Sequence, residues 1–149
     1  MKLEAPSLES LLTNWEKDAV LDRTDPGKEL LRIPILHAKY NRFLTLHNLA
    51  LKRSLIEASR IKKLKWLYYT GKMDKSELEK LGWEPFQFTL KSDISVYIEG
   101  DPDIANLNKK KAYHEEASSF CTYVMKELNN RTWQLKEFCT MERFIQGQH

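Results

Sequence analysis

A basic and aromatic stretch, residues 59–72, contains the side chains best suited to bind a ligand. It reads S-R-I-K-K-L-K-W-L-Y-Y-T-G-K and lies within a longer segment, residues 32–72, that holds ten Lys or Arg and one acid, Glu57. That segment carries a net charge of +9, whereas the whole chain carries +3. Because cations bind phosphates and flat aromatic faces stack on bases, the combination predicts a site for a single-stranded nucleic acid.

A membrane surface or an acidic protein would fit part of the same pattern. Ordinary exposed helices mix both signs of charge and gain i,i+4 ion pairs, and this segment almost lacks acids, which favours nucleic acid. No major-groove motif or zinc fold is present, so a single strand bound without sequence preference is the predicted target. The predicted contacts are Arg53, Arg60, Lys62, Lys63, Lys65, Trp66, Tyr68, Tyr69 and Lys72.

The sequence shows no catalytic constellation. It lacks a G-x-x-x-x-G-K-[ST] phosphate loop, G-x-G-x-x-G and G-x-S-x-G, and its four histidines show no HExxH-like pairing. A Mg²⁺-dependent nuclease site at Asp101, Asp103 and Glu115 is a weaker interpretation than a capped helix start with an exposed acidic face. Cys121 and Cys139 have no neighbours at metal-ligand spacing and are predicted to be reduced core thiols. We therefore expect no enzymatic activity, no cofactor and no bound metal.

The sequence predicts that the basic stretch lies within an all-α fold. With 149 residues, 42% hydrophobic residues and only five Gly and five Pro, the chain is predicted to form one globular domain. No apolar run approaches the ~18 residues of a membrane span. The first residues lack the apolar core of a signal peptide, so we expect an intracellular protein.

The first half of the chain predicts two helices. The pattern predicts one over residues 7–20, with Ser7 as its N-cap, and a break at residues 25–27. A long helix of roughly 50 Å then runs from Pro34 to about Tyr69 and ends at Gly71. One broad face of it is apolar, and the opposite side carries a basic stripe of Lys39, Arg42, Arg53 and Arg60.

Lys62 and Lys65 interrupt this pattern, because helical rotation points both toward the apolar side. An ammonium there is costly unless its stem reaches solvent or an anion meets it. The two lysines therefore mark either the point where the helix leaves the core or a binding site.

The second half predicts a short helix ending near Gly82, a short extended segment near 84–90, and a helical turn around residues 92–99. A helix starting at residues 101–103 is expected to continue to about Leu128, with a break at Asn129 and Asn130. The last helix, residues 132–145, is unusually apolar, so it either docks in the core or is buried against another subunit. Its predicted oligomerisation residues are Leu135, Phe138, Met141, Phe144 and Ile145.

Charge divides the chain into zones. Net charge is −3 over residues 1–29, +9 over 30–72, −5 over 73–104 and +2 over 105–149. We expect one domain, 1–149, with an N-terminal extension (1–33), a basic DNA-binding helix (34–72), an acidic connector (73–103) and a C-terminal oligomerisation region (104–149). The acidic blocks either shield the basic helix within the chain or pair with another copy.

The helix end over residues 64–72, which closes with Y-Y-T-G-K, resembles the end of the basic helix in the UvsY family, the recombination mediators of T-even-type phages. The later order of elements is similar too: L-K-S at residues 90–92, a helix carrying Phe120 and Cys121, and a C-terminal helix ending near Phe144. The resemblance covers the chain from about Leu36 onward.

The resemblance implies that Lys63 and Lys65 match a basic pair implicated in binding single-stranded DNA. Lys65 stands where the family member has Arg, which keeps the charge and loses the planar fork. It also implies a ring-like homo-oligomer of six or seven copies, acting in the cytoplasm of the infected bacterial host cell. Such a mediator loads a RecA-like recombinase onto strands covered by a single-strand-binding protein. The alternative is a non-enzymatic adaptor whose basic face docks an acidic protein.

Overall fold

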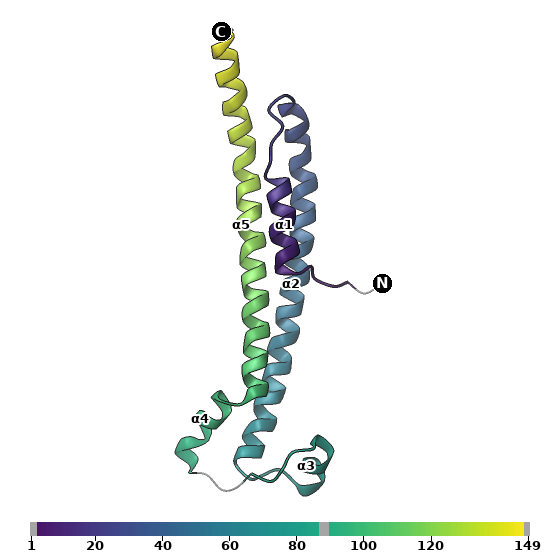
Figure 1. The fold of residues 1–149 in the computed structure, drawn as a ribbon, viewed down its shortest axis with the longest axis vertical. Helices are drawn as coiled ribbons and strands as arrows, with labels where there is room; N and C mark the ends of the chain where they lie inside the picture. Colours follow the sequence, from purple (N-terminus) through teal and green to yellow (C-terminus); the bar gives the residue numbers. More distant parts are fainter. Residues whose placement is uncertain (1–2, 87–89, 148–149) are drawn as a thin grey trace. The chain divides into compact units, whose positions relative to one another are not determined.

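The computed structural model describes residues 3–86 and 90–147, and every regular element in them is helical (Figure 1). The predicted all-α class is therefore confirmed. The predicted extended segment near 84–90 falls largely on residues 87–89, which lie outside the described residues, and those that are described there form no strand. The elements are α1 (Leu8–Asp18), α2 (Pro26–Tyr69), α3 (Lys75–Leu81), the 3₁₀ turn η1 (Lys91–Asp93), α4 (Ile94–Glu99) and α5 (Pro102–Ile145).

The chain forms two compact units. Unit 1 comprises Met1–Ala50 and His114–His149, and unit 2 comprises Leu51–Tyr113, so α2 and α5 each contribute to both. The predicted division into one domain with four segments stays a prediction. None of the helices within the described ranges combines the length and hydrophobicity that crossing a bilayer requires.

Unit 1 has a three-helix core, and Figure 1 shows α1 beside the first part of α2. Leu36 and Tyr40 of α2 pack with Val124 and Leu128 of α5, and Trp15 of α1 packs against this cluster. The Trp15 and Tyr40 rings meet edge to face with centroids 5.8 Å apart. Ser7 caps α1 as predicted, since its hydroxyl accepts a hydrogen bond from the Ser10 amide at 3.1 Å.

Asp18, the last residue of α1, joins all three helices of unit 1. Its carboxylate accepts hydrogen bonds from Lys39 at 2.7 Å and from the Tyr40 hydroxyl at 2.9 Å. Its carbonyl accepts one from the buried Arg131 guanidinium at 3.0 Å. Burial, and then the hydrogen bond to Asp18, raise the pKa of Tyr40 above its ordinary value. Lys39 of the predicted basic stripe is therefore a structural cation.

The predicted start of the long helix is wrong, because α2 begins at Pro26 and contains Pro34 inside it. The Asp25 side chain accepts a hydrogen bond from the Lys28 amide at 3.1 Å, as an N-cap residue does. Pro26 then occupies the first helical position, where its missing N–H costs nothing. The residues predicted as a break, 25–27, therefore form the N-cap and the first turn of α2.

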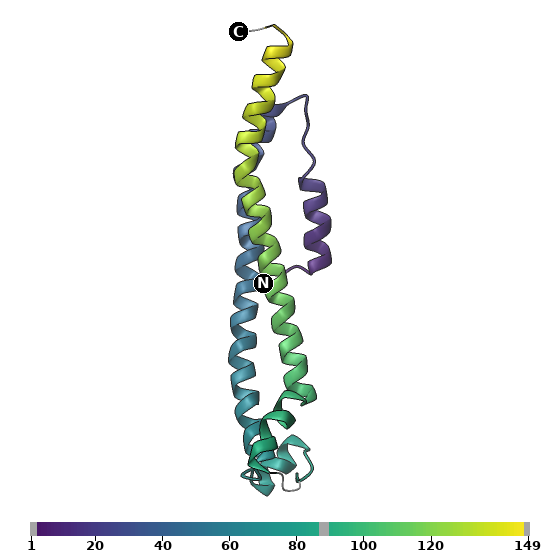
Figure 2. The ribbon, with the colours of Figure 1, turned by 90° about the vertical axis from the view of Figure 1, so that its left-hand side faces the viewer.

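The predicted break at Asn129 and Asn130 is also wrong. Figure 2 shows α5 as one uninterrupted helix, and it runs for 44 residues. Residues 103–145 contain no Gly or Pro, and Asn lowers helix stability by less than about 1 kcal/mol. Leu128 and Arg131, on either side of the Asn pair, are both buried. Tertiary packing therefore carries the helix through the weak positions.

Candidate nucleic-acid interface

The C-terminal end of α2 is fixed by a Schellman motif. Gly71 has a φ of 72°, in the left-handed region that favours glycine, as its predicted role at the helix end requires. The Lys72 amide donates to the Leu67 carbonyl at 3.0 Å. The turn directs the Lys72 side chain back along α2, where its Nζ lies 4.5 Å from the centroid of the Trp66 ring. A cation and an exposed aromatic ring are thus held together.

Within unit 2, one exposed side of α2 carries the cations, and we call it the basic face. At 100° per residue its members cover about half of the helix circumference. Its one acid, Glu57, binds Arg60 at 2.6 Å, and both side chains are well exposed. The basic face consists of Lys52, Arg53, Arg60, Lys62, Lys63 and Trp66, all exposed. Lys52 was missed by the sequence prediction. Lys62, which helical rotation pointed toward the apolar side, is exposed on this face.

The structure does not place Lys65 on the basic face. Its side chain is buried, with Nζ 2.8 Å from an oxygen of Asp103 and 3.1 Å from one of Asp101. The same Nζ lies 4.1 Å from the centroid of the Trp83 ring. Burial alone would lower the pKa of Lys65, and the two carboxylates outweigh it, so the pKa lies above its ordinary value. The carboxylates of Asp101 and Asp103 thus already bind this ammonium within the chain. Because the Lys65 side chain is buried, its burial argues against a contact with a phosphate.

Tyr68 and Tyr69 are likewise used inside unit 2. The Tyr68 hydroxyl donates to the Glu84 carbonyl at 2.6 Å, and the Tyr69 hydroxyl donates to the Asp101 carboxylate at 2.5 Å. Their rings pack edge to face in a cluster that includes Phe86, whose centroid is 4.9 Å from that of Tyr69. The two tyrosines hold the end of α2 to the following segment, so of the three predicted stacking residues Trp66 is the exposed one.

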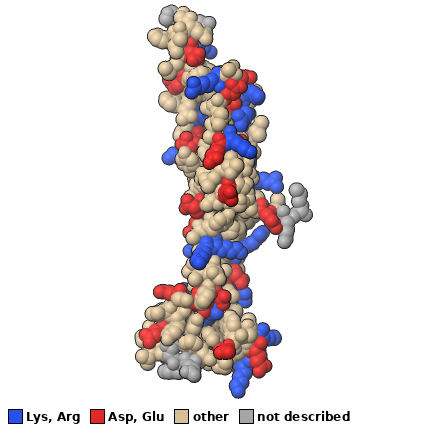
Figure 3. Space-filling model, in the orientation of Figure 1, with Lys and Arg blue, Asp and Glu red and all other residues tan. Residues whose placement is uncertain are grey.

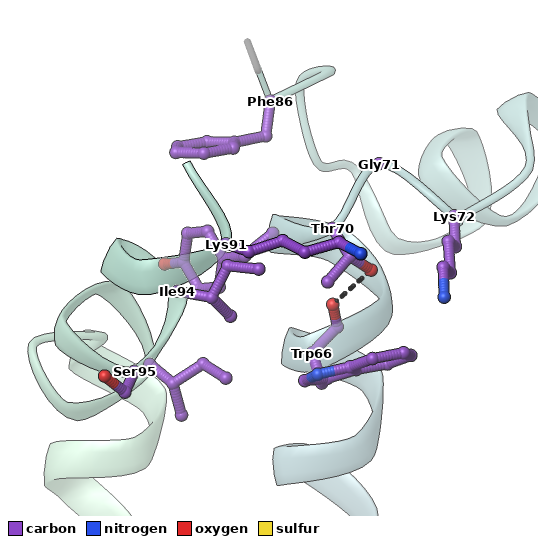
Figure 4. Close-up of a pocket in the computed structure, with 10 residues that line it drawn as sticks. Trp66, Thr70, Gly71, Lys72, Phe86, Lys91, Ile94 and Ser95 are labelled. Carbon is purple, nitrogen blue, oxygen red and sulfur yellow. Dashed lines mark hydrogen bonds between the residues drawn. The ribbon is translucent and has the colours of Figure 1, made fainter. Parts of the chain in front are cut away.

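A pocket of about 750 Å³ opens beside this helix end. Figure 4 shows Lys91 reaching across it toward Thr70, with Trp66 and Lys72 on the α2 side and Phe86 at its far edge. Lys91, Phe86 and the α4 residues of the wall were not predicted as site residues. They follow α2 in the sequence, and the fold of unit 2 brings them beside Trp66.

Unit 2 carries the excess of positive charge. Residues 51–113 contain 13 Lys or Arg and 9 Asp or Glu, whereas the rest of the chain contains 11 and 12. On the face that Figure 3 shows, Lys and Arg side chains form one band and several further patches, with Asp and Glu side chains between them. Ion pairs join Asp18 to Lys39 and Asp101 to Lys65, so each acidic block neutralises part of the basic segment within the chain.

The predicted oligomerisation residues divide into two groups. Leu135 is 4% exposed and belongs to the core of unit 1, and Phe138 is half-buried. Met141, Phe144 and Ile145 are 62%, 74% and 71% exposed, so the end of α5 leaves an apolar surface open to solvent.

Comparison with known proteins identifies structures of the same fold and a matching family. Two crystal structures of the bacteriophage T4 recombination mediator protein UvsY match the fold at 19% sequence identity, with TM-scores of 0.81 and 0.80. The first match covers 93% of this chain and 97% of that one, and the second covers 91% and 98%. No curated protein matches the chain. The family model described as "Recombination, repair and ssDNA binding protein UvsY" matches residues 14–148. The chain therefore belongs to the UvsY family of recombination, repair and single-stranded-DNA-binding proteins.

Proposed function

We propose that the basic face of α2, together with Lys72 and Lys91, is the surface through which this UvsY-family protein binds single-stranded DNA. The observation that carries the proposal is the exposure of five cations on one side of α2, with one acid among them. Lys62 and Lys63 form no ion pair within the described residues, so binding a phosphate there breaks no existing contact. Backbone phosphates are common to every sequence, so we expect binding without sequence preference.

The test compares two double variants that remove the same charge from exposed positions. Lys62→Ala with Lys63→Ala removes two cations from the basic face, and Lys75→Ala with Lys80→Ala removes two from α3. Affinity for a labelled oligothymidylate is measured against salt concentration. For a single strand, each lost phosphate contact should make the slope of log binding constant against log salt concentration less negative by about 0.7. We expect the first variant to flatten the slope by about twice that amount and the second to leave it nearly unchanged. Equal slopes in both variants would move the site away from α2.

The protein acts in recombination as a mediator, and we propose that it does so by helping a RecA-like recombinase load onto strands covered by a single-strand-binding protein. The absence of a phosphate-loop motif from the sequence supports a role in assisting an ATPase without being one. Nucleation of recombinase filaments on covered strands, with and without this protein, tests the role. An equal nucleation rate in both cases would contradict it.

We also propose that the protein works as a homo-oligomer, a ring of six or seven copies, joined through the exposed end of α5. Exposed apolar surface of this kind is typical of an interaction site. Several modest DNA sites in one ring would gain avidity from effective concentration. Light scattering coupled to chromatography should give a mass that falls when Phe144 and Ile145 are changed to Ser. A wild-type monomer would contradict the ring.

A further inference from the structure

The pocket beside the end of α2 has the chemistry of a site for one nucleotide. Its walls include the Trp66 and Phe86 rings and the apolar side chains of Ile94 and Ile98, and apolar atoms line most of it. Two cations, Lys72 and Lys91, also line the pocket, and neither forms an ion pair within the described residues. The pocket therefore offers flat apolar faces with positive charge beside them.

Several polar groups of the pocket are uncommitted. In the part of the chain that the structure describes, the Trp66 indole N–H, the Ser95 hydroxyl and the Lys91 ammonium form no hydrogen bond or ion pair. By contrast, the Thr70 hydroxyl is bound to the Trp66 carbonyl at 2.7 Å. The three residues that carry these groups come from α2, η1 and α4 and line the same pocket.

A nucleobase fits this combination, because it has apolar faces for stacking, polar edges for a hydroxyl or indole N–H, and an attached phosphate for a lysine. Trp66 belongs both to the basic face and to the pocket, so a strand that follows the basic face arrives at the opening. We infer that the pocket receives one unstacked base of the bound strand, with Trp66 as its stacking partner and Lys91 at its phosphate. This inference rests on the proposed function.

The experiment compares oligothymidylate with an abasic oligonucleotide of the same length and charge. The wild-type protein should bind the base-carrying strand about 10-fold more tightly, the difference that one stacked base supplies. Trp66→Ala should remove that preference. The matched control is Trp133→Ala, at a tryptophan of α5 that is 65% exposed and lies outside the pocket, and it should keep the preference.

The outcomes separate the pocket from the proposed function. If the wild-type protein binds neither oligonucleotide, the DNA-binding function itself fails. If it binds both equally, or if Trp66→Ala weakens both equally, the DNA-binding function stands and the base pocket is wrong, which leaves the pocket to another occupant such as an acidic peptide.

A pair of lysine variants gives an independent check on exposed positions where folding is not at risk. Lys91→Ala and Lys80→Ala each remove one positive charge from unit 2, and of these two lysines only Lys91 lines the pocket. We expect Lys91→Ala to weaken oligothymidylate binding several-fold more than Lys80→Ala. Equal effects would overturn the role of Lys91.

Discussion

The ammonium of Lys65 and the carboxylate of Asp101 lie 3.1 Å apart, and their side chains are 8% and 3% exposed. This ion pair connects the end of α2 to the start of α5 inside unit 2. The Tyr69 hydroxyl donates to the same carboxylate. Burial alone would raise the pKa of Asp101, and the hydrogen bonds from Tyr69 and Lys65 outweigh it, so the pKa lies below its ordinary value. The pair is thus a structural connection at the position where the sequence predicted a DNA contact.

Replacing Lys65 should cost stability, and replacing Lys63 should cost DNA affinity. Lys65→Met leaves Asp101 buried without its partner, which we expect to lower the free energy of unfolding by about 3 kcal/mol. Lys63→Met changes an exposed side chain, so its effect on unfolding should stay within about 0.5 kcal/mol while binding to a single strand weakens. Chemical denaturation and oligonucleotide titration of both variants check this. Normal stability with weakened DNA binding in Lys65→Met would return Lys65 to the interface.

His47 should make the protein less stable in mild acid. The ring is fully buried, its Nε2 lies 2.8 Å from the Pro6 carbonyl, and its Nδ1 lies 3.1 Å from Nδ1 of His114. A carbonyl can only accept, so Nε2 carries the hydrogen of the neutral ring, and Nδ1 accepts from His114.

Burial lowers the pKa of His47 from its ordinary value of 6.5. Below that pH the unfolded chain gains a proton that the folded chain does not, so the free energy of unfolding falls as the pH drops, by at most about 1.4 kcal/mol per pH unit. Thermal melts at pH 7.5 and 5.5 should show a smaller difference in His47→Gln than in the wild type. The same difference in both proteins would assign the pH dependence to other groups.

Asn130 tests the continuity of α5. Because α5 runs through this exposed position, Asn130→Pro removes a helical hydrogen bond and introduces a steric clash, and we expect a loss of about 3 kcal/mol or more in the free energy of unfolding. Asn130→Ala is the control and should be neutral or slightly stabilising. Denaturation followed by circular dichroism measures both variants. A proline variant as stable as the wild type would indicate a loop at this point.

The two thiols should differ in reactivity. Cys121 is 0% exposed and burial raises its pKa to about 11, whereas Cys139 is half-buried. Because the thiolate is the reactive form, we expect one fast-reacting thiol at pH 8 in the native protein, and Cys139→Ser should abolish the fast phase. A fast phase that survives in Cys139→Ser would place Cys121 within reach of solvent.

The sequence by itself determined the helical class, most helix ends, the basic segment and the family resemblance. These depend on local features: the period of apolar residues, the cap at Ser7, the glycine at Gly71 and the order of residues along the chain. Helical rotation also identified Lys62 and Lys65 as exceptional, because it needs no knowledge of the neighbouring elements.

Only the tertiary structure decided which of those two lysines faces solvent. Asp101 and Asp103 are 36 and 38 positions from Lys65 in the sequence, and the connecting elements bring them to its ammonium. Packing on both sides of the Asn pair likewise kept α5 continuous, against local preferences worth less than about 1 kcal/mol per residue. Lys91 was likewise found only in the structure, because contacts between segments distant in sequence place it in the same pocket as Trp66.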